Sequence, residues 1–183
     1  MQYDWVDDEG VTEPLTLARA KEHLNVLHDK HDDLITDYIK AARHWTEGYI
    51  SRALVAKTVT VLLSIDELRK VDDVYQVRLP IASTVTAINT ITIDGATFDK
   101  SKTNLYGPRL PLLEIDATAL EDVDTPRNIV IEYDATVYAN QYNCKMAMLQ
   151  IVGNFFHHRD STPLEEQSHI ASILTPDKLH YYV

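Results

Sequence analysis

The strongest pattern in the chain is a stripe of apolar side chains that predicts a long amphipathic helix over residues 32–52. The members of the stripe follow one another mostly at steps of three and four, and they are Leu34, Ile35, Tyr38, Ile39, Ala42, Trp45, Tyr49, Ile50 and Ala53. The polar residues Asp37, Lys40, Arg43 and Glu47 are expected on the other faces. Acidic Asp29, Asp32 and Asp33 offer an N-cap candidate and negative charge at the positive end of the helix dipole. A helix about 30 Å long with this apolar stripe should determine how the neighbouring elements pack.

Further helices are predicted on both sides of this one. A short helix opens at Leu15–Leu17 with Thr16 as its N-cap candidate, and a second long helix, apolar over much of its circumference, runs from 142 to 158. One or two helical turns follow at 169–174. Each long helix contains a glycine, Gly48 and Gly153, which is unfavourable in a helix interior. We therefore expect these two glycines to mark a close crossing of the two helices.

The middle of the chain changes to the alternation typical of strands. The predicted strands are 58–63, 75–79, 85–93, 96–98, 110–115 and 128–133, and the stretch 116–126 is predicted to be an acidic loop. The pair Asp94-Gly95 is a strong signal for a two-residue hairpin. The order of elements predicts an α+β fold of two or three packed helices with a small antiparallel sheet inserted between them.

The pattern divides the chain into an N-terminal arm over 1–13, a central domain over 14–159 and a C-terminal arm over 160–183. The central domain comprises a helical body, 14–55 and 140–159, and the β insertion, 57–134. Both arms carry apolar and aromatic residues near the chain ends, which is unusual unless these residues dock on their own domain or on a partner. The candidate partner-interface residues are Tyr3, Trp5, Leu179, Tyr181, Tyr182 and Val183.

Composition narrows the possible functions. The net charge of −11 argues against a protein that wraps DNA by neutralising phosphates, although it allows a surface past which DNA slides. The single cysteine, Cys144, excludes an intrachain disulfide. The sequence shows no export signal and no run approaching the length of a membrane span, which predicts a soluble protein with no membrane partner.

No catalytic signature is present. The G-x-S-x-G, H-E-x-x-H, P-loop and G-x-G-x-x-G motifs are absent, so we expect no enzyme, no cofactor and no metal. His28 and His31 have metal-compatible spacing, but they lie in a predicted connection without a second ligand cluster, and surface polar residues are the favoured interpretation. Cys144 is interpreted as a core or interface thiol. The open alternative is a hydrolase, which a deep pocket with a carboxylate and two of His23, His28, His31 and His44 would favour.

Several stretches of the sequence resemble the small head–tail connector (adaptor) proteins of tailed phages. The similarity extends from about Leu15 to Arg159, and the order and spacing of the matching stretches are more specific than any one motif. It is carried by residues 14–24 (PLTLARAKEHL), 32–35 (DDLI), 41–49 (AARHWTEGY), 52–54 (RAL), 78–80 (RLP), 85–88 (VTAI) and 155–159 (FFHHR).

The resemblance implies a structural protein of the virion neck, assembled in the host cytoplasm. It implies a ring, typically of twelve copies, that docks beneath the portal protein, joins it to a stopper or tail protein and lets double-stranded DNA pass without sequence-specific binding. Twelve copies at −11 each give 12 × −11 = −132 of formal charge, which suits a lumen that repels phosphates. Another neck component, such as a stopper or tail-completion protein, is the alternative within this class.

Overall fold

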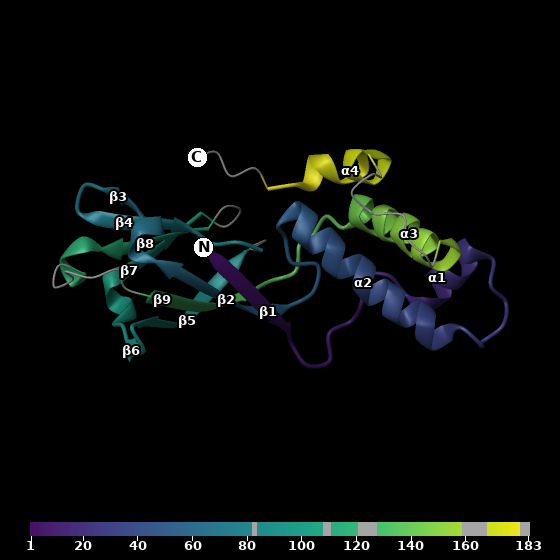
Figure 1. Cartoon of the computed structure of the whole chain (residues 1–183), viewed down its shortest axis with the longest axis horizontal. Helices are drawn as coiled ribbons and strands as arrows, with labels where there is room; N and C mark the ends of the chain where they lie inside the picture. The colour runs from purple at the N-terminus through teal and green to yellow at the C-terminus, as the bar shows by residue number, and fades with distance from the viewer. Residues whose placement is uncertain (82–83, 108–110, 121–127, 159–167, 180–183) are drawn as a thin grey trace.

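The computed structural model describes residues 1–81, 84–107, 111–120, 128–158 and 168–179. It is an α+β fold in which the helices gather at one end and the strands at the other (Figure 1). The predicted fold class is therefore confirmed in outline. The details differ, because the described residues form four helices and two antiparallel sheets, where two or three helices and one small sheet were expected.

The helical end is built on α2 (Asp32–Ile50), which packs against α3 (Tyr142–His157). Helices α1 (Leu17–Leu24) and α4 (Ser168–Leu174) complete the group. One apolar core joins all four, and its central members are Ala20, Leu24, Ile35, Ile39, Ala42, Ile50, Cys144, Met148, Ile151, Val152, Ile170 and Leu174. The two long helices were predicted almost to their ends, since their apolar stripes are what this core buries.

The strand end consists of two sheets that share a second core. The first has the order β1-β2-β9-β5-β6, and the second has the order β3-β4-β8-β7. The strands are β1 (Gln2–Asp7), β2 (Lys57–Ser64), β3 (Arg69–Val71), β4 (Val74–Arg78), β5 (Val85–Ile93), β6 (Ala96–Thr97), β7 (Thr103–Tyr106), β8 (Leu112–Asp116) and β9 (Asn128–Ala135). Short 3₁₀ turns lie at Ile65–Glu67, Lys100–Lys102, Ala117–Ala119 and Thr175–Asp177.

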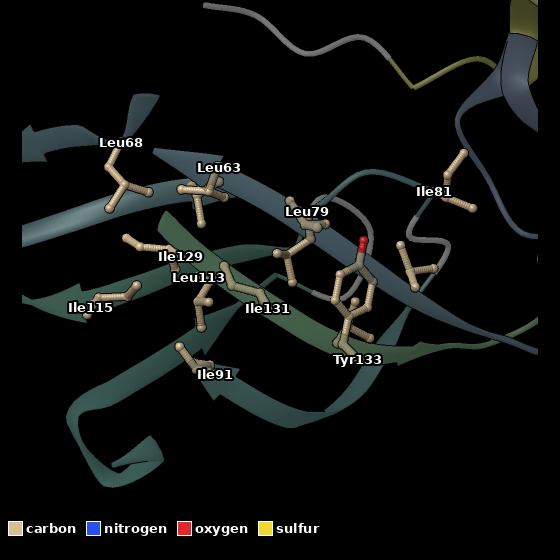
Figure 2. Close-up of a cluster of buried hydrophobic side chains, with 14 of the residues drawn as sticks. Leu63, Leu68, Leu79, Ile81, Ile91, Leu113, Ile115, Ile129, Ile131 and Tyr133 are labelled. Carbon is tan, nitrogen blue, oxygen red and sulfur yellow. The ribbon is translucent and has the colours of Figure 1, made fainter. Parts of the chain in front are cut away.

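The alternating residues of these strands interdigitate between the sheets. Ile91, Ile129, Ile131 and Tyr133 come from the first sheet, and Leu113 and Ile115 come from the second (Figure 2). The Tyr133 hydroxyl donates a hydrogen bond to the Pro80 carbonyl, which satisfies a polar group inside the core. The period-2 pattern was thus sufficient to place the inner strands.

The hairpin at Asp94-Gly95 is confirmed, with Ile93 opposite Ala96. Both loop residues have positive φ, 50° for Asp94 and 82° for Gly95, which is the backbone that a two-residue hairpin turn requires. Three strands were not predicted. The strands β3 and β7 are short, and β1 was assigned to a terminal arm because four of the first nine residues are acidic.

The N-cap of α1 is the one that the sequence predicted, whereas the N-cap of α2 is a different residue. Thr16 caps α1 as expected, since its Oγ1 accepts a hydrogen bond from the Arg19 N–H at 3.3 Å. In α2 the N-cap position is taken by His31, whose side chain makes no capping hydrogen bond in the described part of the chain. Asp32 and Asp33 instead lie in the first turn, where they still favour the helix dipole.

The structure does not place a close helix crossing at Gly48. A Cβ added to Gly48 would meet nothing within 4 Å in the described residues, and Gly48 is exposed. A Cβ added to Gly153 would lie 3.5 Å from Nε2 of His23, which belongs to α1. The helices α2 and α3 pack through larger apolar residues, so the Gly48–Gly153 crossing is corrected to an α1–α3 contact at Gly153.

Candidate functional site

The N-terminal residues Tyr3 and Trp5 lie on a strand of the first sheet. Strand β1 pairs antiparallel with β2, from Gln2 opposite Leu62 to Asp7 opposite Lys57. Trp5 packs against the sheet core, and its ring centroid lies 5.2 Å from Nζ of Lys57. Tyr3 stacks on Trp5 and keeps 37% of its surface exposed. Of these two candidate interface residues, Tyr3 is the more exposed.

A buried ionic cluster joins this strand to α2. Its centre is Glu47, which is fully buried and whose Oε2 lies 2.6 Å from Nζ of Lys57 and 3.1 Å from Nη1 of Arg43. The other carboxylate oxygen, Oε1, accepts a 2.6 Å hydrogen bond from the N–H of Leu54. Glu47 therefore fixes the backbone where the chain passes from α2 into β2, and it does so with its charge compensated by two buried cations.

The guanidinium of Arg43 extends this cluster to the N-terminal segment. It donates hydrogen bonds to Asp7 at 2.6 Å and to Glu13 at 2.9 Å, so it fixes both ends of the stretch 8–12. Burial alone would raise the pKa of Asp7, but the hydrogen bond from Arg43 and the charge of Lys57 hold that pKa below its usual range. Burial would likewise lower the pKa of Arg43, whereas its bonds to Glu13 and Asp7 raise it. Charge pairing thus outweighs burial for both groups.

The C-terminal segment is attached to the C-terminal end of α2. Asp177 is buried, and its carboxylate accepts hydrogen bonds from the Tyr138 hydroxyl at 2.7 Å and the Asn143 amide at 2.9 Å. Burial, followed by the interaction with Asp177, raises the pKa of Tyr138 to about 12. The Leu179 N–H donates to the Ile50 carbonyl at 2.9 Å, and Leu179 is 5% exposed. Leu179 is therefore part of the domain, and Tyr181, Tyr182 and Val183 lie outside the described residues.

An apolar surface lies along the first half of α3. Tyr142 is 74% exposed and Met146, one turn later, is 38% exposed. Beside them is a groove of about 310 Å³ that is also lined by Pro14 and Leu15. Val137, which precedes α3, adds a further exposed apolar side chain. We call Tyr142, Met146, Pro14 and Val137 the α3 apolar surface.

Histidines gather around a cavity of about 430 Å³ between α1, α3 and α4. It is lined by His23, His157, His158 and His169, and its described lining contains no carboxylate. Of the four histidines that would favour a hydrolase, it contains only His23. His28 and His31 contact each other through their rings, with centroids 5.1 Å apart. Within the described residues, no three His, Cys, Asp or Glu side chains are arranged to hold a metal ion.

Cys144 lies in the helical core, where burial raises the pKa of its thiol to about 12. A thiol of this kind is protonated at neutral pH, which matches the interpretation of a core residue. In the described part of the chain, the helices all fall short of the length and apolar character that crossing a membrane requires.

The comparison with protein families bears on residues 14–88, which span α1, α2, β2, β3, β4 and the start of β5. These residues match the family described as "Phage gp6-like head-tail connector protein". The resemblance noted in the sequence is therefore confirmed over this part of the chain. None of the curated proteins compared with the chain matches it.

Solved structures of similar fold cover nearly the whole chain. A chain in "Neck of empty GTA particle computed with C6 symmetry" has a TM-score of 0.70 at 18% identity, with 100% of this chain and 98% of that chain covered. A chain in "Neck of native GTA particle computed with C12 symmetry" has a TM-score of 0.65 at 14% identity, with 100% and 98% covered. A chain in "Virion of native gene transfer agent (GTA) particle" has a TM-score of 0.63 at 16% identity, with 95% and 97% covered. At these identities the likeness establishes the shared fold.

The ionic cluster was missed by reasoning from the sequence. Arg43 and Glu47 were assigned to the polar face of the long helix, but both are buried. Their spacing of four residues was a usable signal, since it places opposite charges side by side on a helix. Lys57 opens a strand whose alternate residues Val59 and Val61 are buried, so its own inward position could have been inferred from the period of the strand.

Proposed function

We propose that this protein is a structural subunit of the ring that connects the head and the tail in the neck of a tailed phage or phage-like particle. The observation that carries the proposal is the family match over residues 14–88. The fold supports it, because the similar chains come from particle necks and are covered over 98% of their length in two cases. In this proposal the ring docks beneath the portal, contacts a stopper or tail protein on its other side and encloses the path of the DNA.

A copy number of twelve is supported by one similar structure, a neck computed with C12 symmetry. The α3 apolar surface is the candidate contact between neighbouring copies, because large apolar side chains are exposed together there. The negative net charge of −11 supports a lumen that does not bind phosphates tightly. A channel lined mainly by Lys and Arg would contradict this part of the proposal.

Imaging and mass measurement of the purified protein test the ring directly. Mass photometry and class averages from electron microscopy should show a closed ring for the native chain. The double substitution Tyr142→Glu and Met146→Glu should yield single copies, since it places charges in a contact that excludes water. The matched control is Leu27→Glu, which changes a side chain that is 95% exposed in the loop between α1 and α2.

Binding to a purified portal ring separates a connector from another neck component. A connector should bind the portal without a third protein, whereas a stopper or tail-completion protein should need the connector first. A chain that remains solitary at high concentration and binds neither portal nor tail protein would refute the proposal.

A further inference from the structure

A cavity of about 780 Å³ lies at the start of β1, between this strand, strand β4 and the end of α2. Its described lining mixes apolar and polar side chains. The apolar members include Tyr3, Val77, Pro80 and Leu112, and the polar members are Ser51, Glu67, Arg69, Gln76 and Arg78. The volume is in the range of clefts that bind a ligand, so the cavity is large enough to receive the tip of a loop.

The two arginines give this cavity a positive charge that the fold leaves uncompensated. Arg69 and Arg78 are both exposed, and among the described residues no carboxylate forms an ion pair with either of them. The lining carboxylate, Glu67, instead accepts a hydrogen bond from the Ser64 N–H at 2.8 Å. Guanidinium groups donate paired hydrogen bonds to carboxylates, so the cavity suits an acidic segment of a protein.

An acidic loop, residues 8–12, lies at the other end of β1. Its carboxylates, Asp8 and Glu9, are exposed and have no ion-pair partner within the described ranges. Gly10 has a φ of 72°, and a Cβ added there would meet none of the described atoms within 4 Å, so the tip is open to approach. In Figure 1 the purple strand β1 runs from the N mark to this loop. At about 3.3 Å per residue, Tyr3 in the cavity and Asp8 in the loop lie about 17 Å apart along the chain.

The loop is held away from the cavity of its own chain. Arg43 binds Asp7 at 2.6 Å and Glu13 at 2.9 Å, one on each side of the loop, and the Asp8 N–H donates to the Ala56 carbonyl at 3.1 Å. The loop therefore stays at the end of the strand that is remote from the cavity. Two complementary patches at opposite ends of one strand can meet only between copies, and such a contact repeats head to tail and closes into a ring where the rotation allows.

We infer that the cavity is the docking site for the acidic loop of a second copy of this chain, with Asp8 and Glu9 of one copy against Arg69 and Arg78 of the next. The inference rests on the proposed function and deepens it, because it names a contact between neighbours in the ring. Since Arg43 already fixes both ends of the loop, docking orders little additional chain. The contact is electrostatic at the surface, so it should weaken as the salt concentration rises.

Charge reversal on each side of the contact tests the inference, with sedimentation velocity and mass photometry of the full chain as the readouts. The loop variant carries Asp8→Lys and Glu9→Lys, and the cavity variant carries Arg69→Glu and Arg78→Glu. Each variant alone places like charges on both sides of the contact, so association should weaken by roughly tenfold or more. A chain with all four substitutions has its charges exchanged and should associate like the native chain.

The matched control is the double variant Lys30→Glu and Lys40→Glu, which reverses two exposed cations outside the cavity and changes the net charge as much as the cavity variant does. It should associate like the native chain. A 1:1 mixture of the loop variant and the cavity variant provides a second rescue, because each loop then meets a cavity of opposite charge in the other variant. Circular dichroism of each variant establishes that the fold is intact.

The inference is overturned if either reversal variant assembles like the native chain, or if neither the exchanged chain nor the mixture recovers association. Native chains that remain single copies also refute it, whereas binding to the portal decides the proposed function separately. Association that is lost on reversal and recovered on exchange, but that gives open chains of subunits, would support this contact and contradict the closed ring.

Discussion

The substitution Glu47→Gln is expected to lower the free energy of unfolding by about 3–5 kcal/mol, the range for breaking a buried charge pair from one side. Glutamine has nearly the same shape, and it keeps an oxygen for the Leu54 N–H. It removes the negative charge that lies 2.6 Å from the Lys57 ammonium and 3.1 Å from the Arg43 guanidinium. Lys57 is 0% exposed and Arg43 is 2% exposed, so water cannot replace the lost carboxylate at either cation.

Urea unfolding, followed by circular dichroism and tryptophan fluorescence, measures this loss. Trp5 is a direct reporter because its ring lies 5.2 Å from Nζ of Lys57. The matched control is Asp37→Asn, which neutralises an exposed carboxylate on the same helix. Since surface substitutions of this kind usually change stability by less than about 0.5 kcal/mol, the two variants should differ by several kcal/mol.

A double-mutant cycle that combines Glu47→Gln with Lys57→Met measures the interaction energy between Glu47 and Lys57 apart from the other contacts of the cluster. Each single substitution leaves a buried charge without its main partner, whereas the double variant replaces the pair with neutral groups of similar size. The double variant should therefore be more stable than the sum of the single effects predicts, by about 0.5–3 kcal/mol. An effect of Glu47→Gln no larger than that of Asp37→Asn, or strict additivity in the cycle, would show that the cluster does not hold β1 and β2 against α2.

Three further changes test other parts of the structure. The pKa of Asp7 is lowered in the folded chain, so ionised Asp7 stabilises the fold at pH values above its ordinary pKa of 3.8. This stabilisation is lost as the pH falls through the lower pKa of the folded state. Asp7→Asn should therefore flatten the acid limb of a stability–pH curve. Asp177→Asn should destabilise the fold by about 1–3 kcal/mol in urea unfolding and speed proteolysis after residue 174, because Tyr138 and Asn143 both donate to that carboxylate. Thr16→Ala should lower the unfolding free energy by about 1 kcal/mol through the loss of the α1 cap, whereas Thr16→Ser should have little effect.

Elements with a long regular period were predictable from the sequence. The apolar stripe of α2 and the wide apolar face of α3 extend over several turns, so the helical period stays recognisable even where one residue departs from it. The same holds for β2, β5 and β9, whose alternate residues are buried in one core. The hairpin at Asp94-Gly95 was predictable for a different reason, because its backbone requires residues that accept positive φ.

The remaining elements depend on contacts between distant parts of the chain. Strand β1 resembled a solvated acidic arm, and it is ordered because Asp7 meets Arg43, 36 residues away in the sequence. Arg43 and Glu47 were predicted on polar faces of the helix, and they are buried because Asp7, Glu13 and Lys57 form ion pairs with them in the fold. The short strands β3 and β7 carry too few residues for a period, and pairing with β4 and β8 determines them.

Segments near the two ends of the chain are attached to the same helix, and this has a mechanical consequence for the proposed function. The N-terminal segment is bound through Asp7 and Glu13 to Arg43, in the middle of α2, and the C-terminal segment is bound through Leu179 to Ile50, at its end. Glu47 lies between these two attachments and also fixes the entry into β2. A partner that binds either terminus therefore acts on α2 and, through Glu47, on the sheets. In the proposed ring, a neighbour that binds one of these terminal segments would therefore load α2 and the sheets as well as that segment.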